Sequence, residues 1–556
     1  MKSDLEIARE TGLRHILDIA SSIGIGEDEA MLCGRHKAKL ALSLLERLRS
    51  RPEGKLVMVT AMTPTAYGEG KTTTAIGLSM AFNRIGRRSI VTLRQPSLGP
   101  VFGLKGGAAG GGYAQVLPME DINLHFTGDI HAVASAHNLV SAMVDNHIYQ
   151  GNELDIFSPR VVFPRTVDHN DRALRDIIVA LGGTGHGVPR EDSFIITAAS
   201  EVMAVLSLSM SLAELRERLG RIIVAYRRNG QPVTVSDLGV QGAMTAMLKD
   251  ALQPNLVQTT EGTPALIHCG PFANIAHGTN SILATRMALH MADVVVTETG
   301  FGSDLGAEKF FHIVAPQAGL NVHGVVLVVS LRAIKFHGGA SKEEIMKISA
   351  SALRTGMANA LRHVAIMRLF GVPVVVALNR FPGDSEEEVQ ICLELFEKEH
   401  VPVSASRVFE QGGEGGVDLA RLVSRYIDAS DGHYQNLYQR DDTVEQKIGT
   451  IARRVYGAGQ IMYQLQARKD LKEIASLGFS HLPICVAKTP HSLSDEAKAI
   501  GVPRDFDFTV RTIHICAGAG FLVPVAGDIM LMPGLPKRPA ALNADVDQDG
   551  RVSGLF

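Results

Sequence analysis

The stretch that decides the fold is Leu56-Val57-Met58-Val59-Thr60-Ala61-Met62-Thr63-Pro64-Thr65-Ala66-Tyr67-Gly68-Glu69-Gly70-Lys71-Thr72-Thr73-Thr74. It predicts an apolar strand, a loop with two glycines, and a helix opened by a Lys-Thr pair. In such a phosphate-binding loop, backbone N–H groups and the helix N-terminus hold phosphate oxygens. Lys71 would reach the outer phosphates, and the Thr72 hydroxyl can bind Mg²⁺. The expected ATP-binding residues are Thr65, Ala66, Tyr67, Gly68, Glu69, Gly70, Lys71 and Thr72.

The loop departs from the usual G-x-x-x-x-G-K-[ST] pattern at one position, where Thr65 stands in place of the first glycine. An ordinary glycine-rich turn between a strand and a helix is the alternative. Because both flanking elements and the Gly70-Lys71-Thr72 sequence are in place, the context favours phosphate binding.

Short apolar runs without alternation recur along the chain, as is typical of strands buried on both faces of a parallel sheet. Helices are expected between them, at 72–85 and 352–369. This order predicts an α/β fold: a P-loop NTPase-like, doubly wound, mostly parallel sheet with additional smaller α/β domains. Ligands bind such sheets beyond the carboxyl ends of the strands. The expected strands are 56–60, 89–93, 194–197, 221–225, 265–268, 294–297, 325–330 and 373–378.

The sequence predicts three domains. A polar stretch at 442–468, expected to be helical, precedes short strands at 484–487, 512–516 and 522–525 and marks a separate C-terminal unit. The expected domains are a nucleotide-binding α/β domain over 1–300, a second α/β domain over 301–440, and a C-terminal α/β domain over 441–556.

Composition excludes several classes of protein. The 556 residues carry a net charge of -3, so no global positive field attracts nucleic acid or an anionic membrane. No apolar run approaches the length of a membrane span. The five cysteines are dispersed without a C-x-x-C motif, which argues against a disulfide framework or a zinc ribbon. A cytoplasmic protein without nucleic-acid or membrane partners is expected.

Two further features point to the same edge of the sheet. Arg94 follows the strand expected at 89–93, and its planar guanidinium can bind a carboxylate or an acyl phosphate. A surface salt-bridge arginine is the alternative. The run at 103–113 holds five glycines and two alanines within seven residues, so its backbone either approaches a ligand closely or is flexible. The residues alone do not decide between these two.

Six segments together closely resemble the formate–tetrahydrofolate ligase family. The resemblance extends from the N-terminal helix to Pro533-Gly534-Leu535-Pro536, and the glycine run is its most specific part. It implies ATP-dependent ligation of formate to tetrahydrofolate, giving 10-formyltetrahydrofolate, ADP and phosphate through formyl phosphate. It also implies Mg²⁺, a monovalent cation (K⁺ or NH₄⁺) and a homotetramer. The segments are 65–72, 94–100, 103–113, 121–129, 299–302 and 332–339.

The resemblance also assigns roles to individual residues. Arg94 would hold formate and then formyl phosphate between the nucleotide and folate pockets. The domain at 301–440 would contribute the folate pocket through Phe301, Phe381, Pro382 and Phe409, with plain core packing as the alternative for each phenylalanine. Phe409 stands where many bacterial members carry tryptophan, and this chain has none.

Weaker candidates complete the predicted site. Asp129 could orient Mg²⁺ or formate, and His268, at a strand end, could act in proton transfer. A structural role is the alternative for each. Arg332 and Lys335 could bind the folate polyglutamate tail or stabilise the fold. The predicted catalytic residues are Lys71, Arg94, Asp129 and His268.

Two other functions stay open. One is a related P-loop ATPase or kinase that lacks folate chemistry. The other is a folate- or nucleotide-binding homologue without ligase activity. The presence of Lys71, Thr72, Arg94 and the full glycine run counts against loss of the chemistry.

Overall fold

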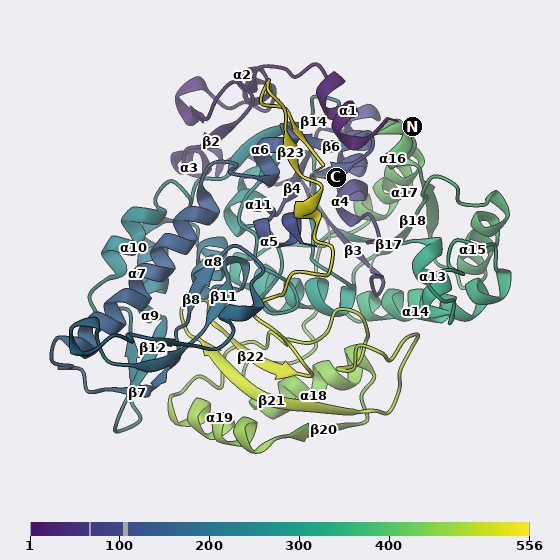
Figure 1. The fold of residues 1–556 in the computed structure, drawn as a ribbon. Coiled ribbons are helices and arrows are strands. Elements are labelled where there is room, and N and C mark those ends of the chain that lie inside the picture. Colours follow the sequence, from purple (N-terminus) through teal and green to yellow (C-terminus); the bar gives the residue numbers. More distant parts are fainter. Residues whose placement is uncertain (1, 66–67, 104–108, 555–556) are drawn as a thin grey trace.

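The computed structural model describes residues 2–65, 68–103 and 109–554. A twelve-stranded sheet forms its centre (Figure 1). Seven neighbouring strands of this sheet are parallel, which confirms the predicted α/β fold with a large, mostly parallel sheet. In spatial order they are β15 (Pro264–Ile267), β4 (Ser89–Leu93), β16 (Val294–Glu298), β3 (Lys55–Ala61), β17 (Gly324–Val329), β18 (Val374–Asn379) and β19 (Val403–Ser406).

Antiparallel strands extend the sheet beyond β15. The strand β14 pairs with both β15 and β2, and β6 pairs with β14. These additions belong to the half of the sheet that also carries the glycine run. Their bounds are β1 (Ala30–Leu32), β2 (Ala38–Leu40), β14 (Asn255–Thr259), β5 (Gly110–Gly111) and β6 (Ala114–Leu117).

Helices cover both faces of the parallel strands. Val57 and Val59 share one hydrophobic core with α4 (Lys71–Arg84) and α17 (Val417–Asp428). Leu56 and Met58, which alternate with them along β3, belong to a second core with α11 (Ile282–Leu289) and α14 (Ala350–Arg368). Burial on both faces explains why these strands show no polar alternation in the sequence.

Two predicted strands lie outside the central sheet, so their placement in it was wrong. The strand β11 (Phe194–Ile196) pairs with β8 (Arg165–Val167), and β12 (Ile223–Arg227) pairs antiparallel with β7 (Ile156–Val161) and β13 (Pro232–Thr234). An apolar run indicates that both faces of a strand are buried, but it does not indicate to which sheet the strand belongs. In β12, Val224 and Ala225 belong to the large core, whereas Ile223 and Tyr226 pack in a small cluster with Ala517.

The C-terminal part contains a second small sheet of β20 (Gln460–Tyr463), β21 (Asp507–Cys516) and β22 (Phe521–Ala526). The stretch at 442–468 was predicted to be helical, and this is only partly correct. It contains α18 (Val444–Ile451), a π-helical turn, β20 and the start of α19 (Leu465–Ser476). The segment 484–487 contributes only isolated bridges to β22.

The central sheet continues across the domain boundary predicted at residue 300, because β16 precedes that boundary and β17 to β19 follow it. The three-domain division therefore stays a prediction. Within the described ranges, no helix combines the length and the apolar character needed to span a bilayer.

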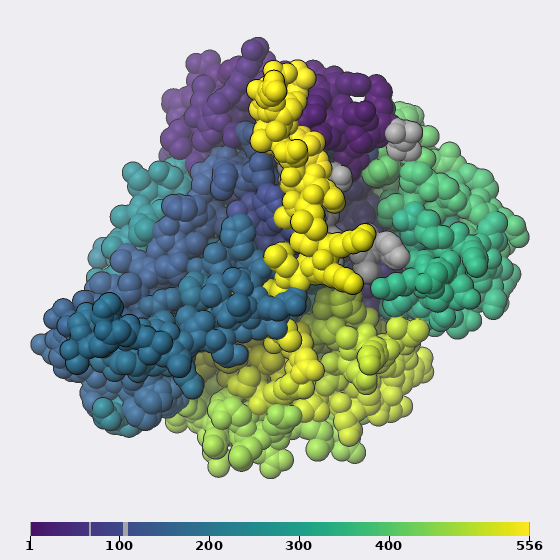
Figure 2. Space-filling view, in the orientation of Figure 1, coloured from purple at the N-terminus to yellow at the C-terminus, as the bar shows by residue number. Residues whose placement is uncertain are grey.

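The two ends of the chain meet on one face. The hairpin of β23 (Asp545–Val546) and β24 (Val552–Ser553) lies beside α1 (Asp4–Glu10), where Arg9 donates a hydrogen bond to the Val552 carbonyl. Figure 2 shows this last part of the chain, in yellow, running over the face, with purple segments on both sides at the top and blue and green segments on either side below.

Candidate active site

The predicted phosphate-binding loop, called the phosphate loop below, joins the carboxyl end of β3 to the first turn of α4. Gly68 and Gly70 both have left-handed backbones, with φ of +76° and +74°. A Cβ atom on Gly70 would lie 2.3 Å from the Asn379 amide nitrogen, so only glycine fits there. Lys71 opens the helix. Two residues predicted to bind ATP, Ala66 and Tyr67, lie outside the described residues.

The side chain of Glu69 stabilises the loop through buried hydrogen bonds. One oxygen of its buried carboxylate accepts hydrogen bonds from the Thr65 N–H (2.7 Å) and hydroxyl (2.9 Å). The other accepts from the Ser330 hydroxyl, at the N-terminus of α13 (Leu331–His337). Asn379 donates to the Glu69 carbonyl at 3.1 Å. Thr65, at the position of the missing glycine, thus uses its hydroxyl to stabilise the loop.

A single carboxylate connects the phosphate loop with Arg94. The Thr72 hydroxyl donates to Glu298 Oε2 at 2.8 Å, and Arg94 Nη2 lies 3.6 Å from Glu298 Oε1. Glu298 ends β16, which lies between β3 and β4, and only 5% of its side chain is exposed. Glu298 was not among the site residues predicted from the sequence. Its signal was its position directly after the strand expected at 294–297.

The Arg94 guanidinium has donors left for a ligand. Its Nη1 makes a long 3.4 Å hydrogen bond to the Pro271 carbonyl, while its buried Nε has no hydrogen-bond partner among the described residues. A Cβ atom on Gly300 would lie 2.8 Å from Nη1, so this glycine leaves room for the arginine. An incompletely satisfied guanidinium at the sheet edge suits a carboxylate or phosphate.

Oxygen donors beside the loop suit a divalent cation. Mg²⁺ is commonly bound through one or two protein oxygens together with substrate phosphates. The Thr72 hydroxyl and the Glu298 carboxylate, 2.8 Å apart, provide such oxygens. Within the described ranges no group of three or more His, Cys, Asp or Glu side chains could hold a metal ion alone.

Two aromatic residues extend the site from the loop. Phe381 follows β18, and its ring would lie 3.8 Å from a Cβ atom on Gly70. The Arg332 guanidinium stacks on the same ring, 4.5 Å from its centroid. Phe301 directly follows Gly300 and has a φ of +56°, a strained conformation for a phenylalanine. Pro382 is exposed next to Phe381.

Phe409 contacts the glycine run from α16 (Val408–Gln411). Its carbonyl accepts a 2.8 Å hydrogen bond from the Tyr113 N–H. A Cβ atom on Gly112 would lie 2.0 Å from that carbonyl, and one on Gly111 would lie 3.1 Å from the ring. At these two positions the glycines permit a close approach of one backbone to another part of the chain. Residues 104–108 of the glycine run lie outside the described part.

The family model for formate–tetrahydrofolate ligase matches residues 2–556. The chain belongs to this family. The formate–tetrahydrofolate ligase of Pseudothermotoga lettingae is 53% identical to it over 556 residues, with all of both chains covered. The predicted resemblance and the prediction of a ligase are confirmed.

The two weaker catalytic candidates of this ligase-family chain lie in a buried polar network. Asp129 accepts hydrogen bonds from Lys39 and Asn255, both at 2.7 Å. His268 contacts the Ser281 hydroxyl at 2.6 Å and the Ala251 carbonyl at 2.7 Å. Burial lowers the pKa of His268 to about 4. Their catalytic roles stay predictions that this geometry does not favour, because their polar atoms already serve the protein interior.

Arg332 and Lys335, the two cationic residues proposed for the folate tail, have different environments in the structure. Lys335 is buried and forms a 3.0 Å ion pair with Glu388 in α15 (Glu386–Lys398), which is a structural role. In the part of the chain that the structure describes, Arg332 has no ion-pair partner, and its Nε is buried without a hydrogen bond. Arg332 is therefore the better candidate for binding an anionic substrate group.

Proposed function

We propose that this chain ligates formate to tetrahydrofolate with ATP, giving 10-formyltetrahydrofolate, ADP and phosphate. The observation that carries the proposal is the position of Glu298 between Thr72 and Arg94. Through Glu298, Thr72 and Arg94 lie side by side at one edge of the parallel sheet, which supports assigning ATP to the loop and a small anion to Arg94. Transfer of a phosphoryl group from ATP to a small carboxylate requires this juxtaposition.

The first step activates formate, which is a poor electrophile. A formate oxygen forms a bond to the terminal phosphorus of ATP while the bond from that phosphorus to ADP breaks, which gives formyl phosphate. Lys71 and the N-terminal N–H groups of α4 bind the outer phosphates, and Arg94 holds the carboxylate in line.

Mg²⁺ would bind beside the loop through the Thr72 hydroxyl and the Glu298 carboxylate, and when bound it supplies positive charge to the phosphate oxygens. Glu298 also orients Arg94. Glu69 keeps the loop backbone in its phosphate-binding shape through Thr65 and Ser330.

The second step transfers the formyl group. The N10 amine of tetrahydrofolate forms a C–N bond to the formyl carbon, the C–O bond to phosphate breaks, and the nitrogen gives its proton to the departing phosphate. Arg94 keeps hold of the phosphate as it leaves. We assign the flat apolar surface for the pterin to Phe301, Phe381, Pro382 and Phe409.

One assay tests this function. ADP release is measured with formate and tetrahydrofolate added separately and together, while 10-formyltetrahydrofolate is quantified. The proposed ligase needs both substrates for turnover and accumulates the product. An ATPase or kinase releases ADP without both, and a binding homologue gives no turnover. Lys71→Ala should abolish turnover, whereas Lys249→Ala, which removes an exposed lysine, is the matched control.

A further inference from the structure

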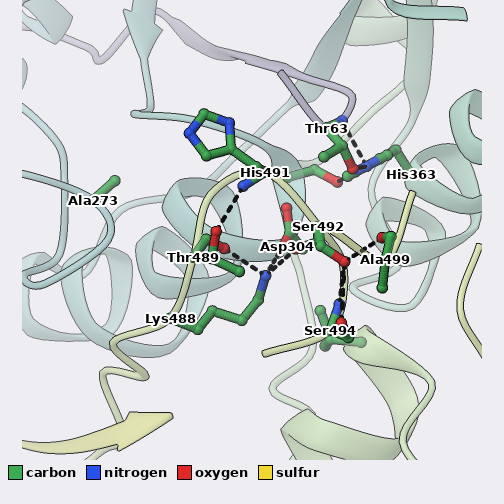
Figure 3. Close-up of polar contacts among 12 residues, drawn as sticks. Thr63, Ala273, Asp304, His363, Lys488, Thr489, His491, Ser492, Ser494 and Ala499 are labelled. Carbon is green, nitrogen blue, oxygen red and sulfur yellow. Dashed lines mark hydrogen bonds and ion pairs between the residues drawn. The ribbon is translucent and has the colours of Figure 1, made fainter. Parts of the chain in front are cut away.

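Two buried histidines hold the chain where it leaves β3 and enters the phosphate loop. The Thr63 N–H and hydroxyl both lie 2.8 Å from Nε2 of His363 (Figure 3). The Thr63 carbonyl lies 3.1 Å from Nε2 of His337. All three side chains are buried. The start of the loop is thus fixed by imidazole rings from α13 and α14, and not by the sheet alone.

The other nitrogen of His363 contacts the turn that follows Phe301. Its Nδ1 lies 2.8 Å from the hydroxyl of Ser303, the first residue of a π-helical turn over Ser303–Ala307. Because the Thr63 N–H donates to Nε2, the ring proton is on Nδ1 and is donated to Ser303. One neutral imidazole therefore connects the phosphate-loop segment with the Phe301 segment.

The same turn is anchored from the C-terminal part of the chain. Asp304, next to Ser303, forms a 2.8 Å ion pair with the fully buried Lys488 (Figure 3). Lys488 also donates to the carbonyls of Thr489 and Ser492. A charge pair buried in this way resists displacement, since separating it leaves an uncompensated charge in the interior.

The C-terminal segment also contacts His337, the second histidine that contacts Thr63. The Gly501 N–H donates to Nδ1 of His337 at 3.1 Å, which leaves the Nε2 proton of that ring for the Thr63 carbonyl. Asn359 donates to the Gly501 carbonyl at 2.6 Å and to the Thr63 hydroxyl at 3.3 Å. Burial lowers the pKa of both His337 and His363 to about 4, so both rings are neutral near pH 7.

We propose that His363 is a positioning residue that couples the phosphate loop to the Phe301 turn, so that nucleotide and folate affect each other's binding. The proposal rests on the proposed function, because it assigns nucleotide to the loop and folate to Phe301. Both bonds of the ring are short, and the ring is closely packed. Thr63 and Ser303 therefore keep their relative positions, so a force that a bound nucleotide exerts on Thr63 also acts on the Phe301 turn. By thermodynamic linkage the effect is reciprocal.

Three variants of the full chain separate the two bonds. The amide of His363→Gln reaches the place of Nε2 and retains the Thr63 contact, while that of His363→Asn reaches the place of Nδ1 and retains the Ser303 contact. Ser303→Ala removes a single hydroxyl and keeps the ring, so it guards against a general folding defect. Calorimetry measures the Kd of ADP with and without saturating tetrahydrofolate. The ratio of the two Kd values reports the coupling.

For the unchanged chain we expect the Kd of ADP with saturating tetrahydrofolate and the Kd without it to differ by at least about fivefold. His363→Gln and Ser303→Ala should move the ratio close to one while ADP still binds. His363→Asn should weaken ADP binding as well, because Thr63 loses its partner. A ratio of one in the unchanged chain, or an unaltered ratio in all three variants, overturns the proposal.

A matched control separates positioning from stability. His137 is equally buried and uses both ring nitrogens, with the Ser200 hydroxyl at 2.8 Å and the Pro164 carbonyl at 2.7 Å. His137→Gln should lower Tm as His363→Gln does, yet keep the wild-type ratio. If the control also abolishes the coupling, the proposal fails. Turnover assays of the unchanged chain test the ligase function separately: coupled binding without turnover refutes that function and leaves the coupling standing.

Discussion

The hydroxyl of Thr72 donates a 2.8 Å hydrogen bond to the carboxylate of Glu298. This bond joins the first turn of α4 to the end of β16, and the same carboxylate lies 3.6 Å from Arg94. Two adjacent strand ends, at β4 and β16, and the first turn of the helix that follows β3 thereby place one residue each at the centre of the site.

Glu298→Gln should impair catalysis without disrupting the fold, because the amide retains the shape and one acceptor but loses the charge. We expect the Mg²⁺ concentration for half-maximal turnover to rise about 10- to 100-fold. Turnover at varied Mg²⁺ and constant ATP measures this. Glu261→Gln, at an exposed ion pair with Arg84, is the control. An unchanged Mg²⁺ dependence would remove Glu298 from the site.

Arg94→Lys should act mainly on formate. Lysine keeps the charge but loses the planar fork that holds a carboxylate through two hydrogen bonds. Loss of one charge-assisted bond corresponds to about a 10- to 100-fold fall in kcat/KM for formate. Initial rates at varied formate check this value. Arg88→Lys, at an exposed ion pair with Asp293, should behave as the unchanged chain, and equal losses in both variants would contradict the assignment.

The parts of the site that could be predicted from the sequence are local. The strand at 56–60, the glycines of the loop and the Lys71-Thr72 pair lie close together in the chain, so spacing alone places them. Arg94 was placed correctly at the same edge because it follows β4, another parallel strand of the same sheet. Local spacing thus predicted the positions of the loop residues and of Arg94 at the sheet edge.

The remaining contacts depend on residues far apart in the chain. Glu298 accepts from Thr72 across 226 positions, and His363 contacts Thr63 across 300. Nothing in the neighbouring sequence distinguishes these side chains from other polar residues at strand or helix positions. His268 is the opposite case: it ends a predicted strand, but its ring nitrogens contact Ser281 and Ala251 in the interior, so its catalytic role stays a prediction that the geometry does not favour.

Phe409→Leu should weaken tetrahydrofolate binding. Leucine retains apolar character but removes the flat ring, which contributes about 0.5–1.5 kcal/mol to aromatic stacking beyond its area. KM for tetrahydrofolate should rise several-fold, while the Kd of ADP stays constant. Phe396→Leu, in the buried face of α15, should lower Tm and leave KM unchanged. A variant of Phe409 with wild-type KM would assign this ring to packing against the glycine run.

Arg332 and Lys335 lie one helical turn apart in α13, yet their substitution should have different effects. Arg332→Gln should raise KM for tetrahydrofolate and leave Tm nearly unchanged, because within the described residues Arg332 has no ion-pair partner to lose. Lys335→Met leaves Glu388 unpaired in the interior and should cost about 3–5 kcal/mol of stability. Thermal unfolding and initial rates on both variants separate the two roles.

Glu201 should make stability depend on pH. Burial raises the pKa of this carboxyl from 4.5 to about 7, against hydrogen bonds from the Gly518 and Ala519 N–H groups at 2.8 and 3.1 Å. The folded state favours the protonated carboxyl. The contribution of Glu201 to the free energy of unfolding is therefore complete below pH 4.5 and is lost as pH rises through 7. Glu201→Gln is neutral throughout and keeps an acceptor for both N–H groups. Its Tm advantage over the unchanged chain should therefore grow from near zero at acid pH to its maximum above pH 7. Glu217→Gln, at an exposed position, should show no such trend, and a Tm difference independent of pH would contradict the assignment to Glu201.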